Sequence, residues 1–426
     1  MRDILVTLVV FGALPWVLRS PVNGALLWVW ISVMNPHTQG WGFATAFPFA
    51  LVVALVTMAS MLITREPRRL PSTHVSRVML ALTAWMCATL PFSMFPELSL
   101  EMWWKVMKIM LMSFVCMMLV KSERDIRRLV WVLAISLGYY GVKGGVFTLR
   151  SGGGNRVWGP AGTFIGDNNA IALALIMVIP LMVFLRQHST RRWVRHALAA
   201  SMLLCALAAL GAYSRGALLA IAAMVLVLWL KSRSKMAAAV MLATAAPLLI
   251  AFMPPEWGSR MESIRSYQAD GSAQGRLNAW GMAWNLARDR FFGGGFAIYE
   301  EPVFAIYAPN PADLHAAHSI YFQMLGEHGF VGLALYLLLG LLAWRDAAWI
   351  IRHAAPVAEL RWAAGLAAMI QTSLTGFAVG GAFLSLAYFD LPYYLVGILV
   401  TTRVLVERAL AVPAAHAAGA PAKALA

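Results

Sequence analysis

The chain has 426 residues, of which 61% are hydrophobic and only 12% are charged, and its formal net charge at pH 7 is +15. This composition excludes an ordinary soluble enzyme and is typical of a polytopic membrane protein. The positive charge alone would suggest a nucleic-acid partner, but lysine and arginine cluster in short segments between apolar runs, as in the cytoplasmic loops of membrane proteins, so we expect no nucleic-acid binding.

Apolar runs long enough to cross a bilayer recur along the whole chain. The first region, residues 4–34, contains Pro15, Arg19 and Pro21 and fits either one kinked crossing or two short helices. The remaining predicted spans are 43–64, 76–90, 102–120, 129–149, 170–186, 194–213, 216–230, 236–253, 318–344, 362–381 and 386–406. The preferred interpretation is an all-α polytopic membrane protein with about twelve transmembrane helices and both termini inside; two crossings in the first region would give thirteen and an outer N-terminus.

The positive-inside rule assigns the basic segments between spans to the cytoplasmic side. This predicts four regions: nine transmembrane helices in 1–253, one large helical periplasmic loop at 254–317, the C-terminal transmembrane helices at 318–411, and a disordered tail at 412–426. Residues 151–169 and a tight turn at 211–216 are also placed outside. The three cysteines, Cys87, Cys116 and Cys205, fall in separate spans and predict neither a disulfide framework nor a metal site.

Within the long outer loop, residues 276–291 show helical spacing. An apolar stripe at intervals of three and four residues predicts an amphipathic helix lying along the membrane interface; it consists of Leu277, Trp280, Trp284, Ala287 and Phe291. Arg276 would lie in the first turn, where backbone N–H groups and the helix dipole favour an anion.

Two histidines, His315 and His318, follow where the chain re-enters the membrane. Asp313 is a suitable N-cap for a helix that would place both rings on one face of its first turn. His318 fits a structural hydrogen bond to a loop carbonyl, or a general base acting on a hydroxyl. Zinc binding by His315, His318 and Asp313 is a further alternative, although no other ligand cluster supports it.

Arg215 lies between two apolar runs, in the predicted turn at 211–216. A guanidinium is costly in lipid, so it either reaches the surface or faces a polar cavity that holds an anion. Arg156 and Asn168, with Arg150 and Asp167, are candidates to line the same chamber from the earlier outer loop. No Asp-x-Asp or Glu-x-Asp pair occurs on the predicted outer side, so arginines rather than a divalent cation would hold a diphosphate there.

In their order along the chain, several short motifs resemble the O-antigen ligase and polymerase superfamily. They are Tyr213-Ser214-Arg215-Gly216, Gly275-Arg276 with Trp280, Gly293-Gly294-Gly295, Ala317-His318-Ser319-Ile320-Tyr321-Phe322-Gln323 and Glu327-His328-Gly329-Phe330-Val331-Gly332. The opening Asn35-Pro36-His37 and Trp41-Gly42-Phe43-Ala44 resemble O-glycosylation ligases associated with exosortase systems. The family commonly has Asn after the histidine, whereas this chain has Ser319.

The resemblance implies an O-antigen ligase, a metal-independent inverting glycosyltransferase of the GT-C type in the bacterial inner membrane. Its active site would face the periplasm, its donor would be a polysaccharide on undecaprenyl diphosphate, its acceptor a lipid A-core sugar, and no cofactor is expected. Arg215 and Arg276 match the family arginines that engage the donor diphosphate, and His318 matches its essential histidine, the acceptor base. We expect further substrate contacts from His315, Tyr213, Tyr321, Asn168 and Arg156.

Three other functions fit the same features. An O-antigen polymerase or a protein O-glycosylation ligase would use the same lipid donor with a different acceptor. A flippase or transporter of lipid-linked sugars would need ionisable residues near the bilayer midplane. Of the ionisable residues in the predicted spans, Lys105, Lys108 and Lys143 are placed awkwardly, and their long side chains can reach the surface.

Overall fold

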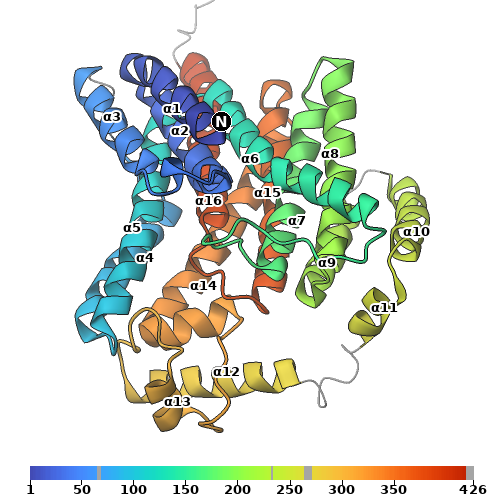
Figure 1. The fold of residues 1–426 in the computed structure, drawn as a ribbon. Coiled ribbons are helices and arrows are strands. Elements are labelled where there is room, and N and C mark those ends of the chain that lie inside the picture. Colours follow the sequence, from blue (N-terminus) through green and yellow to red (C-terminus); the bar gives the residue numbers. More distant parts are fainter. Residues whose placement is uncertain (65–68, 232–233, 263–270, 419–426) are drawn as a thin grey trace, which may run out of the picture.

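The computed structural model describes residues 1–64, 69–231, 234–262 and 271–418, and all regular elements in these ranges are helices (Figure 1). The α-helices are α1 (Arg2–Arg19), α2 (Pro21–Met34), α3 (Phe49–Ile63), α4 (His74–Thr89), α5 (Pro96–Leu119), α6 (Glu123–Arg150), α7 (Asn168–Gln187), α8 (Arg192–Gly211), α9 (Arg215–Lys231), α10 (Lys235–Ala251), α11 (Pro255–Glu262), α12 (Gly271–Asp289), α13 (Glu301–Tyr307), α14 (Ile320–Ala354), α15 (Arg361–Gly381) and α16 (Asp390–Ala418). Every predicted span overlaps a helix, although the bounds differ. The tail predicted as disordered lies partly in α16, and its residues 419–426 fall outside the described residues.

Seven of the described helices are long and apolar enough to cross a membrane, and α2 and α3 are shorter apolar helices. These features identify a multi-pass membrane protein. The total of about twelve crossings is not confirmed by this count and stays a prediction.

The first apolar region forms two helices, which is the second of the two interpretations that the sequence allows, and the number of times it crosses the membrane stays a prediction. The chain breaks at Ser20, whose backbone is extended (φ −153°, ψ 114°), and Pro21 begins α2. Proline lacks an N–H group and fits the first turn of a helix, which explains why the new helix starts there. The start of α1 contacts the segment that follows α2. Arg2 Nη1 donates to the Gln39 carbonyl at 3.1 Å, and Asp3 Oδ1 accepts from Gly42 N at 3.1 Å. The N-terminus therefore lies beside the segment that follows α2.

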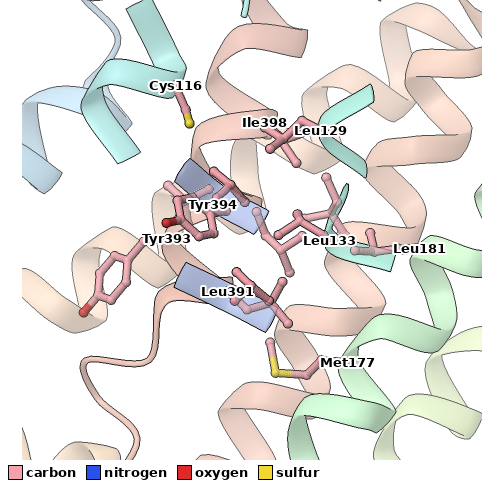
Figure 2. Packing of buried hydrophobic residues seen from close by; sticks show 14 of the residues in the cluster. Cys116, Leu129, Leu133, Met177, Leu181, Leu391, Tyr393, Tyr394 and Ile398 are labelled. Carbon is pink, nitrogen blue, oxygen red and sulfur yellow. The ribbon is translucent and has the colours of Figure 1, made fainter. Parts of the chain in front are cut away.

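The hydrophobic core lies where α16 passes between other long helices (Figure 2). α16 packs against α5, α14 and α15. Buried side chains from four helices meet there, among them Cys116 of α5, Leu129 and Leu133 of α6, Met177 and Leu181 of α7, and Leu391, Tyr394 and Ile398 of α16.

A face of small residues brings α6 and α8 together. A Cβ atom at Gly141 would lie 2.1 Å from Cys205 Sγ, and one at Gly145 would lie 2.4 Å from the Leu204 carbonyl oxygen. Only glycine permits this approach, which is the usual way in which membrane helices pack closely. The loop between α6 and α7 is held in turn by Val157 N, which donates to the Gly211 carbonyl at the end of α8.

The outer loop packs against one end of the bundle, where α12 and α13 lie together at the bottom of Figure 1. The predicted interfacial helix is present as α12, but Ala287 alone of the predicted stripe belongs to the face that the protein buries. The buried face consists of Gly275, Asn278, Ala279, Met282, Ala283, Leu286 and Ala287. Leu277 and Trp284 are exposed on the other side, and Trp280 stacks on Phe322 of α14 with ring centroids 4.8 Å apart.

Candidate active site

His318 lies in a non-helical segment, so the predicted helix beginning at Asp313 is wrong. Its backbone φ of 41° is incompatible with a right-handed helix, and α14 begins only at Ile320. Side chains of α12 bind carbonyls along this segment and hold it in its non-helical path. Asn278 Nδ2 donates to the carbonyl oxygens of Asn310 and Asp313, both at 2.8 Å, and Trp280 Nε1 donates to that of Ala317 at 2.7 Å.

The segment before α14 is fixed from a second side by residues 382–389, which join α15 to α16. The backbone N–H of His318 donates to Ser385 Oγ at 2.9 Å. The same segment meets the start of α9, because a Cβ atom at Gly216 would lie 3.3 Å from Phe383 Cβ. His318 and the residue that follows Arg215 therefore contact one short segment.

Arg276 is near enough to His318 for its charge to lower the pKa of the imidazole, and it lies in the second turn of α12 rather than in the predicted first turn, because the helix already begins at Gly271. This position weakens the predicted contribution of the helix dipole, which is confined to the first turn. His315 packs on the same helix: a Cβ atom at Gly275 would lie 2.4 Å from His315 Nδ1. The His315 Nδ1 atom also lies 2.9 Å from Asp313 Oδ1.

The surroundings of His318 favour its neutral form. Partial burial lowers the pKa of the imidazole, and the positive charge of Arg276 lowers it further. The carboxylate of Asp167 opposes these effects and raises the pKa, while His315 lowers it slightly. Asp167 is held in place as the N-cap of α7, since its Oδ1 accepts from Asn169 N at 2.6 Å and from Ala170 N at 3.0 Å.

Arg215 is the first residue of α9, after the tight turn that the sequence predicts between α8 and α9. Ser214 Oγ caps this helix by accepting from Ala217 N at 3.1 Å. Asn168 Nδ2 donates to the Ala212 carbonyl at 2.7 Å and ties the turn to the start of α7. Arg215 is thus presented at the same end of the bundle as His318 and Arg276.

The residues predicted to contact substrate divide into two kinds. Tyr213 and Asn168 are buried and use their polar groups on backbone carbonyls; Tyr213 Oη donates to the Gly153 carbonyl at 2.7 Å. Tyr321, Arg156 and His315 are partly or largely exposed. Tyr321 Oη donates to the Ala378 carbonyl at 2.8 Å, and the guanidinium of Arg156 lies 5.7 Å from the centre of the Tyr213 ring. Substrate contact by any of the five stays a prediction.

The zinc alternative finds no support. Within the part of the chain that the structure describes, no group of three or more His, Cys, Asp or Glu side chains is arranged to hold a metal ion, and this includes His315, His318 and Asp313.

A buried polar network beside the site was not predicted from the sequence. Tyr388 Oη donates to Glu327, the His328 Nε2 atom lies 2.8 Å from the same hydroxyl, and His328 Nδ1 lies 2.8 Å from Thr89 Oγ1. Ala387 N donates to Gln323 Oε1 at 3.2 Å. These bonds fasten the first turns of α14 to the segment that carries Ser385. The signal in the sequence was an acidic residue inside a long apolar run, which is costly unless it is hydrogen-bonded.

The electrostatics of His318 predict a specific pH dependence. If neutral His318 is required, kcat/KM should fall only below the ordinary histidine pKa of about 6.5, because the pKa is lowered. Asp167→Asn keeps an N-capping side chain but removes the negative charge, so the pKa should fall further and the acid limb should move to lower pH. Arg276→Gln should raise the pKa and move the limb to higher pH. If the pH at which kcat/KM falls moved in the same direction in both variants, these charges would not act on the group that titrates.

Comparisons with known proteins match two parts of the chain. Residues 200–337 match the family model described as O-antigen ligase, and this match includes Arg215, Arg276 and His318. Residues 1–190 match a family of unknown function (DUF5935). The comparison with curated proteins gave no significant match.

Proposed function

Since this chain belongs to the O-antigen ligase superfamily through residues 200–337, we propose that it is an O-antigen ligase. It moves a polysaccharide from undecaprenyl diphosphate to a sugar hydroxyl of lipid A-core, as a metal-independent, inverting glycosyltransferase of the GT-C type. The reaction takes place on the periplasmic face of the bacterial inner membrane.

The observation that carries this proposal is the pairing of His318 with Arg276. A histidine whose pKa is lowered by burial and by an adjacent guanidinium is neutral at physiological pH, as a general base must be. The guanidinium that adds to this effect of burial is also of the type that binds an anion. Arg215, at the same end of the bundle, supplies the second cation.

The mechanism follows from these roles. The acceptor hydroxyl gives its proton to a ring nitrogen of His318, and its oxygen attacks the anomeric carbon of the donor from the side opposite the diphosphate. The bond between the anomeric carbon and the diphosphate oxygen breaks, and its electron pair leaves with undecaprenyl diphosphate. Arg215 and Arg276 stabilise the negative charge that grows on this oxygen, which is the largest type of contribution in such reactions.

A groove suited to the donor lipid begins at Tyr321. It lies between α14, α15 and the start of α16, has a volume of about 390 Å³, and is lined almost entirely by apolar side chains such as Leu337, Phe377 and Trp344. Leu337, Leu341 and Trp344 are 49%, 51% and 41% exposed, so the groove opens on the outside of the bundle, where lipid surrounds a membrane protein. An isoprenoid chain in this groove would place its diphosphate near the start of α14, two residues after His318.

The products that accumulate in cells lacking the protein test this proposal. A ligase predicts free lipid-linked polymer together with unmodified lipid A-core. Core that carries a single repeat unit would instead indicate a polymerase, and normal lipopolysaccharide with an unglycosylated protein would indicate a protein ligase. The purified protein should transfer sugar between lipids in detergent, with the same rate in the presence of a chelator; absence of transfer would favour a transporter.

A further inference from the structure

A polar cavity with a volume of about 460 Å³ lies at the end of the bundle opposite the candidate active site. It is formed by the segment before α4, the end of α5 and residues 401–408 of α16. α16 begins at Asp390, directly after the segment that holds His318, and runs toward the end of the bundle opposite α12 (Figure 1). Arg408, in the cavity wall, lies about 27 Å further along this helix at 1.5 Å per residue, which is close to the thickness of the hydrocarbon core of a bilayer.

The lining of the cavity is cationic. Arg69, Lys121 and Arg408 line it, one from each of the three parts of the chain that form it. Among the described residues of the lining, Glu407 alone has a carboxylate. Three positive side chains therefore stand against one negative side chain, and the excess of positive charge favours an anion in the cavity.

The carboxylate of Glu407 is turned toward its own helix. Its Oε1 atom accepts from Arg403 Nε, one turn earlier on α16, at 2.8 Å. Arg403 also donates to Asp346 of α14, and its guanidinium lies 4.8 Å from the centre of the Trp349 ring. Arg403 and Asp346 are outside the lining, and their opposite charges leave its positive excess unchanged.

The rest of the lining is largely apolar and favours a lipid over a soluble anion. Leu70, Met118 and Leu405 are half-buried there, and Met118 belongs to a helix long and apolar enough to cross a membrane. The glycerol and first acyl carbons of a phospholipid would cover these side chains, whereas inorganic phosphate would leave them in water. The positive-inside rule predicts that this end of the bundle is cytoplasmic, where basic pockets between membrane helices hold anionic lipid headgroups.

We propose that this cavity binds the phosphate headgroup of an anionic phospholipid from the leaflet opposite the candidate active site. The phosphate lies among Arg69, Lys121 and Arg408, and the acyl chains leave past Met118 and Leu405. One lipid then contacts three parts of the chain that are far apart in sequence, and binding to the folded state stabilises that state. The site is remote from His318, so this inference does not depend on the proposed function.

Lipid binding to the purified full-length protein in a nonionic detergent, measured by native mass spectrometry, tests the proposal. The probes are phosphatidylglycerol, phosphatidylcholine with the same acyl chains, and inorganic phosphate. Phosphatidylglycerol should bind most tightly. Arg408→Glu should weaken its binding about tenfold or more, because a basic residue near an anionic lipid is replaced by a repulsive one. Glu407→Gln should strengthen it about fivefold, because this change removes the negative charge from the lining.

Two further variants guard against a general effect of charge or folding. Arg69→Glu should weaken phosphatidylglycerol binding as Arg408→Glu does, and both proteins should remain monodisperse, since both side chains are exposed. Arg192→Glu is the matched control and should leave binding nearly unchanged. Arg192 is an exposed arginine at the start of α8, far from the turn that carries Arg215, and α8 packs on α6 and α7 rather than on the helices around the cavity.

Three results would overturn the proposal. If phosphatidylcholine binds as tightly as phosphatidylglycerol, the cations do not select a headgroup. If Arg69→Glu and Arg408→Glu weaken binding no more than Arg192→Glu does, the lipid lies elsewhere on the protein. If inorganic phosphate binds as tightly as phosphatidylglycerol, the cavity holds a soluble anion instead of a lipid.

Discussion

Replacing His318 by alanine should lower kcat for sugar transfer by about 10²- to 10⁴-fold, the usual contribution of a general base. The side chain lies in a segment held by hydrogen bonds that do not involve the imidazole. Trp280 Nε1 donates to the Ala317 carbonyl, and the His318 backbone N–H donates to Ser385 Oγ. Truncating the imidazole leaves these bonds intact, so the protein should still insert and remain monodisperse in detergent. The rate is measured with purified protein, lipid-linked donor and lipid A-core acceptor.

The change should appear in kcat rather than in the KM for the donor, because the base acts on the acceptor hydroxyl and the arginines hold the diphosphate. His353→Ala is a suitable control: this histidine lies on α14 at the opposite end of the helix, where its Nδ1 atom contacts the Trp349 carbonyl. A His318→Ala protein that transfers sugar at the unaltered rate would remove histidine from the mechanism.

The positions of the helices could be predicted from the sequence because a long apolar run reports directly on membrane crossing. In the first apolar region, the position of the break between helices could not be predicted in this way. Pro15 remains inside α1, whereas the break occurs at Ser20 before Pro21. A proline is compatible with a kink or with a new first turn, and which of the two occurs depends on whether α1 and α2 find contacts as a hairpin.

The candidate site could be predicted as a set of residues but not as a conformation. Arg215 and His318 stood out because charged and titratable groups between apolar runs are costly. The path of residues 310–318 could not be predicted, because side chains of α12 more than thirty positions away determine it. The sequence around Asp313 favours a helix locally, but these hydrogen bonds from α12 stabilise a non-helical path instead. The same limitation concealed Ser385 and the network around Glu327, whose partners come from distant helices.

Replacing either Arg215 or Arg276 by lysine should lower kcat/KM by about 10²- to 10³-fold, nearly as much as replacement by alanine. Lysine keeps the charge but loses the planar fork that holds a phosphate through two parallel hydrogen bonds. Arg276→Lys should therefore leave the acid limb of the pH profile near its original position, because the positive charge beside His318 remains. The kinetics should be measured together with inhibition by undecaprenyl diphosphate, which reports on the diphosphate site without the chemical step.

Arg288→Lys is the control for these variants, since Arg288 is an exposed residue on the same helix as Arg276. It should change neither transfer nor product inhibition. If undecaprenyl diphosphate inhibits the Arg276→Lys protein as readily as the unaltered protein, and the two turn over equally fast, the planar guanidinium of Arg276 does not hold the leaving group. Arg276 would then act on the reaction only through its charge, by keeping His318 neutral, and Arg276→Gln would be the variant that loses activity, mainly at low pH.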